Sequence, residues 1–116
     1  MRDKAPQCGY EVEAVARLLG GKWTLLILYY LAEGTRRFGE LEKLLGINPR
    51  TLSNRLSELE AAGIVSREGY AEVPPRVEYS LTEKGRGLIP IIEAMNAYAK
   101  QWVKVPQSAS DHHAGA

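Results

Sequence analysis

The stretch from residue 48 to residue 57 carries side chains that can hydrogen-bond to nucleic acid bases and phosphates. Arginine can bond guanine through two N–H groups, asparagine can bond adenine in the same way, and serine or threonine can contact bases or phosphates. From Asn48 to Arg55 the local charge is +2, although the whole chain carries only +1. Acidic residues follow only at Glu58 and Glu60. The candidate contacts are Asn48, Arg50, Thr51, Ser53, Asn54, Arg55 and Ser57.

A helix that begins at Pro49 would position these side chains. Asn48 is a favoured N-cap, and Pro49 suits the first helical position because its missing N–H costs nothing there. Ile47 can pack on Leu52 as a hydrophobic staple. At about 100° per residue the buried side would hold Leu52, Leu56 and Leu59, and the outward side Arg50, Asn54 and Ser57. An ordinary solvated helix face has a similar composition, but the well-specified turn before this helix favours recognition of DNA.

Two strands are expected after this helix, at Ile64–Tyr70 and Val77–Leu81. The second alternates apolar and polar residues, which is the period of a strand. The loop between them contains Pro74 and Pro75, which cannot continue a hydrogen-bonded ladder and predict a stiff projecting arm.

Four further arginines could contact the DNA backbone. Arg67 and Arg76 flank the hairpin loop and could reach phosphates or a minor groove. The alternative is that they are solvated strand ends paired with nearby glutamates. Arg36 and Arg37 precede the third helix and could clamp the backbone, or they could be ordinary loop residues.

Four more helical regions follow from apolar spacings of three and four and from glycine stops. These regions are Tyr10–Leu19, Lys22 to Gly34, Phe38 to Gly46, and Thr82 to Val103. Gly85, Gly87 and Pro90 predict a bend or break in the last one. The fold class is therefore mainly α with a small β-hairpin, in the plan of a winged helix-turn-helix.

The last helical region has apolar residues at alternating spacings of three and four, which is typical of a coiled-coil seam. They form more apolar surface than a core of this size needs, which predicts a dimer interface. The expected seam is Leu88, Ile91, Met95, Tyr98 and Trp102.

The composition fits one globular domain. At 116 residues, 45% apolar and 25% charged, the chain is neither disordered nor multidomain. The expected division is an N-terminal arm at 1–9, the domain at 10–103 and a disordered tail at 104–116. Trp23 to Ala32 is too short to span a membrane, and no early segment resembles a signal peptide, so a cytoplasmic protein is expected. One cysteine cannot build a zinc site, and His112 and His113 lie in the expected tail, so neither a metal nor another cofactor is expected.

Several linked segments between about residues 8 and 103 closely resemble the HxlR family of bacterial and archaeal winged-helix regulators. These segments are Gly20–Leu28, Arg37-Phe38 followed by Glu40-Leu41, Thr51–Ser53 followed by Arg55-Leu56, Gly63–Val65, and Glu72–Thr82. The resemblance implies a homodimeric transcription factor related in plan to MarR-type regulators. It also implies that the first and last helices form the dimer interface, that the fourth helix reads DNA and that the hairpin contacts its backbone. Val12 and Val15 of the first helix join the seam residues as expected interface residues.

Cys8 lies just before the expected first helix, where the positive end of the helix dipole lowers a thiol pKa. Lys4 could assist this effect, and Glu11 and Glu13 would oppose it. Some members of the family sense oxidants or electrophiles through an N-terminal cysteine, so the resemblance implies redox sensing. The family commonly has proline after this cysteine, whereas Gly9 follows it here. The alternative for Cys8 is a small buried residue at the dimer interface.

We therefore expect a transcriptional regulator that binds double-stranded DNA at an inverted repeat, as a homodimer without catalytic residues. The alternative function is a winged-helix module that binds proteins and no DNA. The sequence names no small-molecule effector, operator or target gene.

Overall fold

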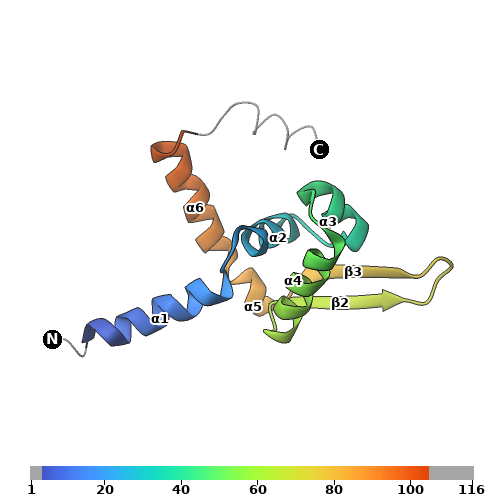
Figure 1. Ribbon diagram of the computed structural model, residues 1–116, viewed down its shortest axis with the longest axis horizontal. Coiled ribbons are helices and arrows are strands. Elements are labelled where there is room, and N and C mark those ends of the chain that lie inside the picture. Colours follow the sequence, from blue (N-terminus) through green and yellow to red (C-terminus); the bar gives the residue numbers. More distant parts are fainter. Residues whose placement is uncertain (1–3, 105–116) are drawn as a thin grey trace.

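The computed structural model describes the backbone of residues 4–104 and the side chains of residues 11–104. The chain folds into a small helical body with a protruding hairpin and two projecting helices (Figure 1). In chain order the elements are α1 (Lys4–Leu18), α2 (Lys22–Ala32), β1 (Arg36–Arg37), α3 (Phe38–Leu45), α4 (Pro49–Ala61), β2 (Val65–Tyr70), β3 (Arg76–Leu81), α5 (Glu83–Arg86) and α6 (Ile89–Trp102). This arrangement confirms the winged helix-turn-helix plan.

The helix α2 is the centre of the core, as its apolar composition predicts. Ile27 and Leu28 are completely buried, and α2 packs against α3, α4, α6 and β3. The core is completed by Leu41 of α3, by the leucines of α4 and by apolar residues of the sheet. The helix α3 ends at Gly46, whose φ of 63° places it in the left-handed region that glycine adopts without strain.

The strands form an antiparallel sheet in the order β1-β3-β2. The hairpin β2–β3 is close to its predicted bounds. The third strand, β1, was not expected: Arg36 and Arg37 pair with Tyr79 and Glu78 instead of lying in a loop. Such a short strand forms only because β3, about forty residues later in the chain, supplies its partners.

The predicted break in the last helical region is confirmed. Thr82 caps α5 by accepting a hydrogen bond from the Gly85 N–H (3.0 Å), and α6 starts only at Ile89. The prediction for the first helix was wrong at its start, because α1 begins at Lys4 rather than Tyr10.

Two helices leave the body in different directions, so the protomer measures 61 × 36 × 23 Å (Figure 1). The side chains of residues 11–17 in α1 are all exposed, and burial begins only at the end of the helix, with Leu18 and Leu19. Among the described helices none alone has the length and hydropathy of a membrane span; residues 11–18 and 22–32 reach them only together, across a bend of 80°.

Candidate DNA-binding surface

The start of α4 is fixed by its own sequence. The Asn48 side-chain oxygen accepts hydrogen bonds from the backbone N–H groups of Arg50 (2.8 Å) and Thr51 (3.3 Å). Pro49 occupies the first turn, and Ile47 and Leu52 are both buried in the core. These observations confirm the predicted cap. Asn48 is also a predicted DNA contact, but its side-chain oxygen is already hydrogen-bonded within α4.

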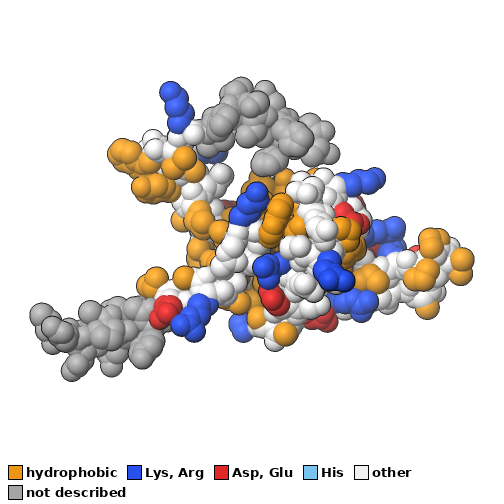
Figure 2. All heavy atoms as spheres, in the orientation of Figure 1, with side chains coloured by type: hydrophobic (Ala, Val, Ile, Leu, Met, Phe, Trp, Pro, Cys, Tyr) orange, Lys and Arg blue, Asp and Glu red, His pale blue; other side chains and the backbone are white. Residues whose placement is uncertain are grey.

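The two sides of α4 differ as the helical period predicts. The buried side consists of Leu52, Leu56 and Leu59, and the exposed residues of the predicted contact set on this helix are Arg50, Ser53, Asn54 and Ser57. Thr51 is half-buried. Figure 2 shows basic side chains around α4 and the base of the hairpin, on the face turned toward the viewer. Four hydrogen-bonding side chains on one rigid helix therefore face solvent together.

Arg55 is partly engaged within α4. Its guanidinium lies 2.8 Å from the carboxylate of Glu58, and this half-exposed pair is of the i, i+3 type. The pair lowers the net positive charge at the middle of α4. Arg50, one turn nearer the N-terminus, has no carboxylate within ion-pair distance among the described residues, and neither has Arg67 of β2.

Arg76 is held inside the hairpin. Its guanidinium lies 3.1 Å from Glu72, 3.5 Å from Glu78 and 4.0 Å above the Tyr70 ring. Its Nε is buried and makes no well-aligned hydrogen bond, so the contact with Glu78 is an ion pair only. Burial, followed by the charges of Glu68 and Glu78, raises the pKa of Tyr70. The pairing with Glu78 that the sequence left as an alternative is thus observed, and Arg76 braces the hairpin.

Arg36 is similarly engaged. Its Nη2 lies 2.7 Å from the Glu33 carboxylate, its Nε donates to the Tyr30 carbonyl (3.3 Å), and its guanidinium lies 6.0 Å from the Tyr30 ring centre. Burial, with smaller contributions from Tyr29 and Glu33, raises the pKa of Tyr30, whereas Arg36 opposes this shift. Arg36 therefore joins β1 to the end of α2.

The register of the sheet separates the remaining arginines. Residues directly opposite each other in a ladder share a face. Arg67 pairs with Tyr79, which is buried, so Arg67 is on the face that packs against the helices, and β2 adjoins α4. Arg37 pairs with Glu78, which in turn pairs with Glu68, so Arg37 is on the opposite face, among glutamates. The register thus places Arg67 and Arg37 on opposite faces of the sheet, with Arg67 on the face of Tyr79.

The hairpin tip is apolar and exposed. Val73 is fully exposed and is followed by two exposed prolines, so the tip projects into solvent as the prolines predict. The exposed residues of this tip carry no positive charge. This feature was not anticipated, although the sequence Val73-Pro74-Pro75 is a signal that could have indicated it.

The residues predicted for the dimer interface are mostly exposed in the protomer. The exposed ones are Val12, Val15, Ile91, Met95, Tyr98 and Trp102. A shallow apolar groove runs along this face of α6. Leu88 is different: it is only 8% exposed, precedes α6 and packs in the core of the protomer.

Cys8 is the fifth residue of α1 and does not precede it. Because the dipole effect falls off within the first turn of a helix, the predicted lowering of the thiol pKa loses its basis. The side chain of Cys8, as well as His112 and His113, lies outside the described part of the structure. Within the described part no group of three or more His, Cys, Asp or Glu side chains could hold a metal ion.

Comparison with known proteins agrees with this architecture. Residues 18–107 match the model of the HxlR-like helix-turn-helix family. An HTH-type transcriptional regulator of Methanothermobacter thermautotrophicus is 46% identical over 92 residues, which cover 78% of this chain and 70% of that protein. An HTH-type transcriptional regulator of Halalkalibacterium halodurans is 52% identical over 80 residues, which cover 67% and 71%.

Solved structures are similar as well. The redox regulator HypR in its oxidised form superposes with a TM-score of 0.77 at 44% identity, covering 82% of this chain and 99% of that one. The reduced form of the regulator YodB from Bacillus subtilis gives a TM-score of 0.72 at 38% identity, covering 81% and 93%. The chain belongs to the HxlR-like helix-turn-helix family of transcriptional regulators.

Proposed function

We propose that this protein acts as a homodimer that binds an inverted repeat in double-stranded DNA, with the two α4 helices in successive major grooves. The observation that carries the proposal is the outward face of α4: its buried leucines and the Asn48 cap fix the helix, and its exposed N-terminal half has no acidic residue. A protein-binding module would favour an apolar surface on this helix. Binding to the chromosome predicts a cytoplasmic location.

Arg50 and Asn54 are the proposed base-reading residues. Both are exposed, they are one turn apart, and their side chains suit guanine and adenine respectively. Ser53 and Ser57 extend the same surface. Arg67 is the proposed phosphate contact of the hairpin, because it is exposed and has no carboxylate within ion-pair distance among the described residues. Thr51, Arg55, Arg36, Arg37 and Arg76 are weaker candidates, because they are half-buried, paired with carboxylates or placed on the other face of the sheet.

The first and last helices are the proposed dimer interface. In the described part of the protomer the residues 11–17 of α1 and one apolar face of α6 are exposed to solvent. A two-fold dimer presents two equivalent recognition helices, so its operator is expected to be a palindrome with half-sites one or two helical turns apart.

Binding to the DNA upstream of its own gene, measured by fluorescence anisotropy over a salt series, tests the proposal. Arg50→Ala and Asn54→Ala are each expected to weaken binding to the operator by about 1 to 3 kcal/mol, while binding to random DNA stays nearly unchanged. Arg67→Ala should weaken binding to both DNAs equally, and it should reduce the slope of log affinity against log salt concentration by about 1. Arg86→Ala, which removes an exposed arginine from α5 outside both the contact set and the proposed interface, is the matched control. Unchanged discrimination in both α4 variants would place base reading elsewhere.

We also propose that Cys8 makes the protein responsive to oxidants. HypR is described as a redox regulator in reduced and oxidised forms, and YodB was solved in reduced and diamide-treated forms. Because each chain has one cysteine, two Cys8 thiols can be oxidised by peroxide to an intersubunit disulfide, with release of two waters, or one can form a sulfenic acid or a disulfide with a small thiol. Its place in α1 couples any such change to the proposed interface.

Oxidant titration of DNA binding tests this role. Peroxide should weaken operator binding by the wild type, a reductant should restore it, and Cys8→Ser should bind normally and ignore peroxide. Non-reducing electrophoresis would report whether the product is an intersubunit disulfide. Equal responses of wild type and Cys8→Ser, or a Cys8 thiol that resists alkylation in the native dimer, would leave the interface-packing role in its place.

A further inference from the structure

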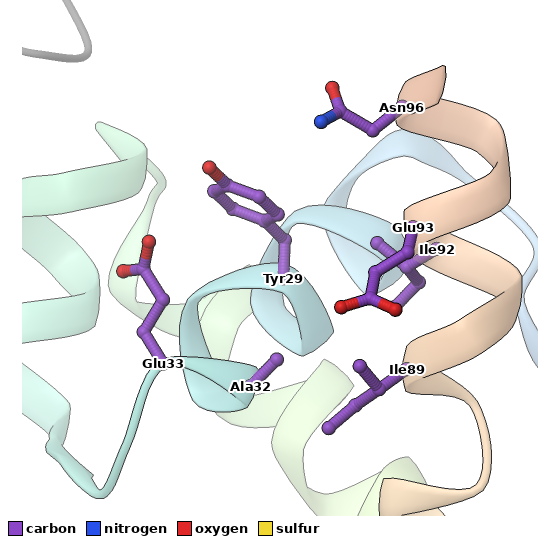
Figure 3. Close-up of a pocket in the computed structure, with 7 residues that line it drawn as sticks. All are labelled: Tyr29, Ala32, Glu33, Ile89, Ile92, Glu93 and Asn96. Atoms are coloured by element: carbon purple, nitrogen blue, oxygen red, sulfur yellow. The ribbon is translucent and has the colours of Figure 1, made fainter. Parts of the chain in front are cut away.

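A cavity of about 200 Å³ lies between α2 and α6 (Figure 3). It belongs neither to the outward face of α4 nor to the exposed apolar face of α6. At about 100° per residue, Glu93, which lines the cavity, points about 160° away from Met95 on the exposed face. The cavity therefore remains accessible when the opposite face of α6 is covered.

The floor of the cavity is apolar. Ala32 of α2 and Ile89 and Ile92 of α6 line it and are half-buried. The ring of Tyr29 forms a wall and is oriented by an edge-on contact with Tyr30, at 5.2 Å between ring centres and 75° between planes. An aromatic wall above an aliphatic floor suits a flat or compact apolar group.

The rim of the cavity is negatively charged. Figure 3 shows Glu93 and Asn96 extending from α6 toward the space beside Tyr29, with Glu33 on the far side. Glu33 is already paired with Arg36 at 2.7 Å. In the described part of the chain Glu93 has no cation within 4.0 Å, and none of the cavity-lining residues is basic. The one uncompensated charge at the site is thus a carboxylate.

We propose that this cavity binds a small organic amine. Its ammonium group is held by the Glu93 carboxylate and the Asn96 side-chain oxygen, and its apolar body packs on Tyr29, Ile89 and Ile92. A cation beside a tyrosine face gains a cation–π contribution in addition to the charge-assisted hydrogen bond. An anion of the same shape is repelled by Glu93, and a neutral analogue loses the charge-assisted bond.

The amine contacts both the core helix and the helix that carries the exposed apolar face. It therefore binds more tightly to one relative position of α2 and α6 than to others, which is the requirement for a ligand to shift a conformational equilibrium. That the amine acts as an effector of operator binding rests on the function proposed above. The binding itself does not, because it is measured on the free protein.

Calorimetric titration of the DNA-free protein with benzylamine, benzyl alcohol and benzoate tests the proposal. Benzylamine should bind with a Kd on the order of 1 mM, which requires from each of its eight non-hydrogen atoms more than a drug-sized ligand supplies and less than the ceiling for small ligands. Benzyl alcohol should bind about tenfold more weakly or not at all, and benzoate should not bind. Glu93→Gln should weaken benzylamine binding about tenfold, and Tyr29→Ala should also weaken this binding.

The matched control is Glu60→Gln, which removes an exposed carboxylate from the end of α4 and should leave the affinity unchanged. Because Glu93 is on the surface, Glu93→Gln is expected to fold, and circular dichroism checks this. The absence of saturable benzylamine binding to the wild type, equal affinities for the amine and the alcohol, or equal affinities of wild type and Glu93→Gln would each overturn the proposal. None of these outcomes depends on whether the protein binds DNA.

Discussion

Gly85→Ala is expected to destabilise the fold strongly. A Cβ atom at Gly85 would lie 2.2 Å from the Ile64 carbonyl oxygen and 3.2 Å from both the carbonyl carbon and Cγ2 of Ile64. The carbonyl cannot move freely, because it accepts a hydrogen bond from the Thr82 N–H (3.0 Å) and lies 3.1 Å from the Thr82 hydroxyl, which donates to the neighbouring Gly63 carbonyl (2.6 Å). The Gly85 N–H donates a hydrogen bond to the same hydroxyl. The substitution therefore separates α5 from the start of β2, at the junction that joins the hairpin to α6.

The cost can be worked from these contacts. Overpacking a rigid site costs about 1 to 3 kcal/mol. The bonds from the Thr82 N–H to the Ile64 carbonyl and from the Gly85 N–H to the Thr82 hydroxyl add about 1 kcal/mol each where they are lost. A loss of about 2 to 5 kcal/mol is a large part of the 5 to 15 kcal/mol that stabilises a typical domain. Urea unfolding followed by circular dichroism, at matched protein concentrations, should show the midpoint falling with an unchanged slope.

Gly39→Ala is the control for this prediction. It makes the same chemical change in α3, where no atom lies within 4 Å of the added Cβ and φ is not in the left-handed region. Alanine in a helix is favoured over glycine by about 0.5 to 1 kcal/mol, so this variant should be slightly more stable than wild type. If Gly85→Ala loses less than about 1 kcal/mol, α5 does not pack on Ile64 as described, because overpacking alone would cost that much.

Three further substitutions test other parts of the structure. Met95→Glu places a charge on the exposed apolar face of α6 and should shift a dimer toward monomer in light scattering, while the protomer stays folded. A wild-type monomer at micromolar concentration would contradict the proposed dimer. Leu88→Ala should instead lower the free energy of unfolding by about 2 to 5 kcal/mol, because Leu88 is in the core. The raised pKa of Tyr30 means that its neutral form contributes stability below the ordinary tyrosine pKa of 10.0, and that this stability is lost as the pH rises through the folded-state pKa. Tyr30→Phe should therefore flatten the alkaline fall of unfolding free energy, with Tyr70 retaining part of it, and an unchanged fall would contradict the assigned burial.

The features that the sequence predicted well depend on neighbours in the chain. The start of α4 follows from Asn48 and Pro49, whose cap bonds span three residues. The break before α6 follows from Thr82, which caps α5 from three residues away, and from the glycines and proline after it. In each case the residue and its partner fall within one helical turn, so composition and spacing contain the information.

The features that the sequence did not predict depend on partners that lie far apart in the chain, or on which helical residues meet the core. Strand β1 exists only because β3 pairs with it. Arg76 seemed available for DNA, but the hairpin register brings Glu78 and Tyr70 around its guanidinium. Leu88 fits the heptad spacing of the seam, yet at the N-cap of α6 it packs in the core of the protomer while the later seam residues are exposed. The start of α1 was missed because Pro6 and Gly9 disfavour a helix interior.

The exposure of α1 bears on how an oxidant could act. A helix of 15 residues is marginal in water by itself, and the side chains of residues 11–17 are exposed in the described part of the protomer. The proposed dimer would cover this helix and so stabilise it. Since Cys8 lies in α1 and the exposed residues of α4 lie on the body, a change at Cys8 would reach DNA binding through the relative position of two protomers. The α4 contacts themselves would remain intact, so an oxidised protein should lose affinity for the two half-sites together while each protomer keeps its preference for the half-site sequence.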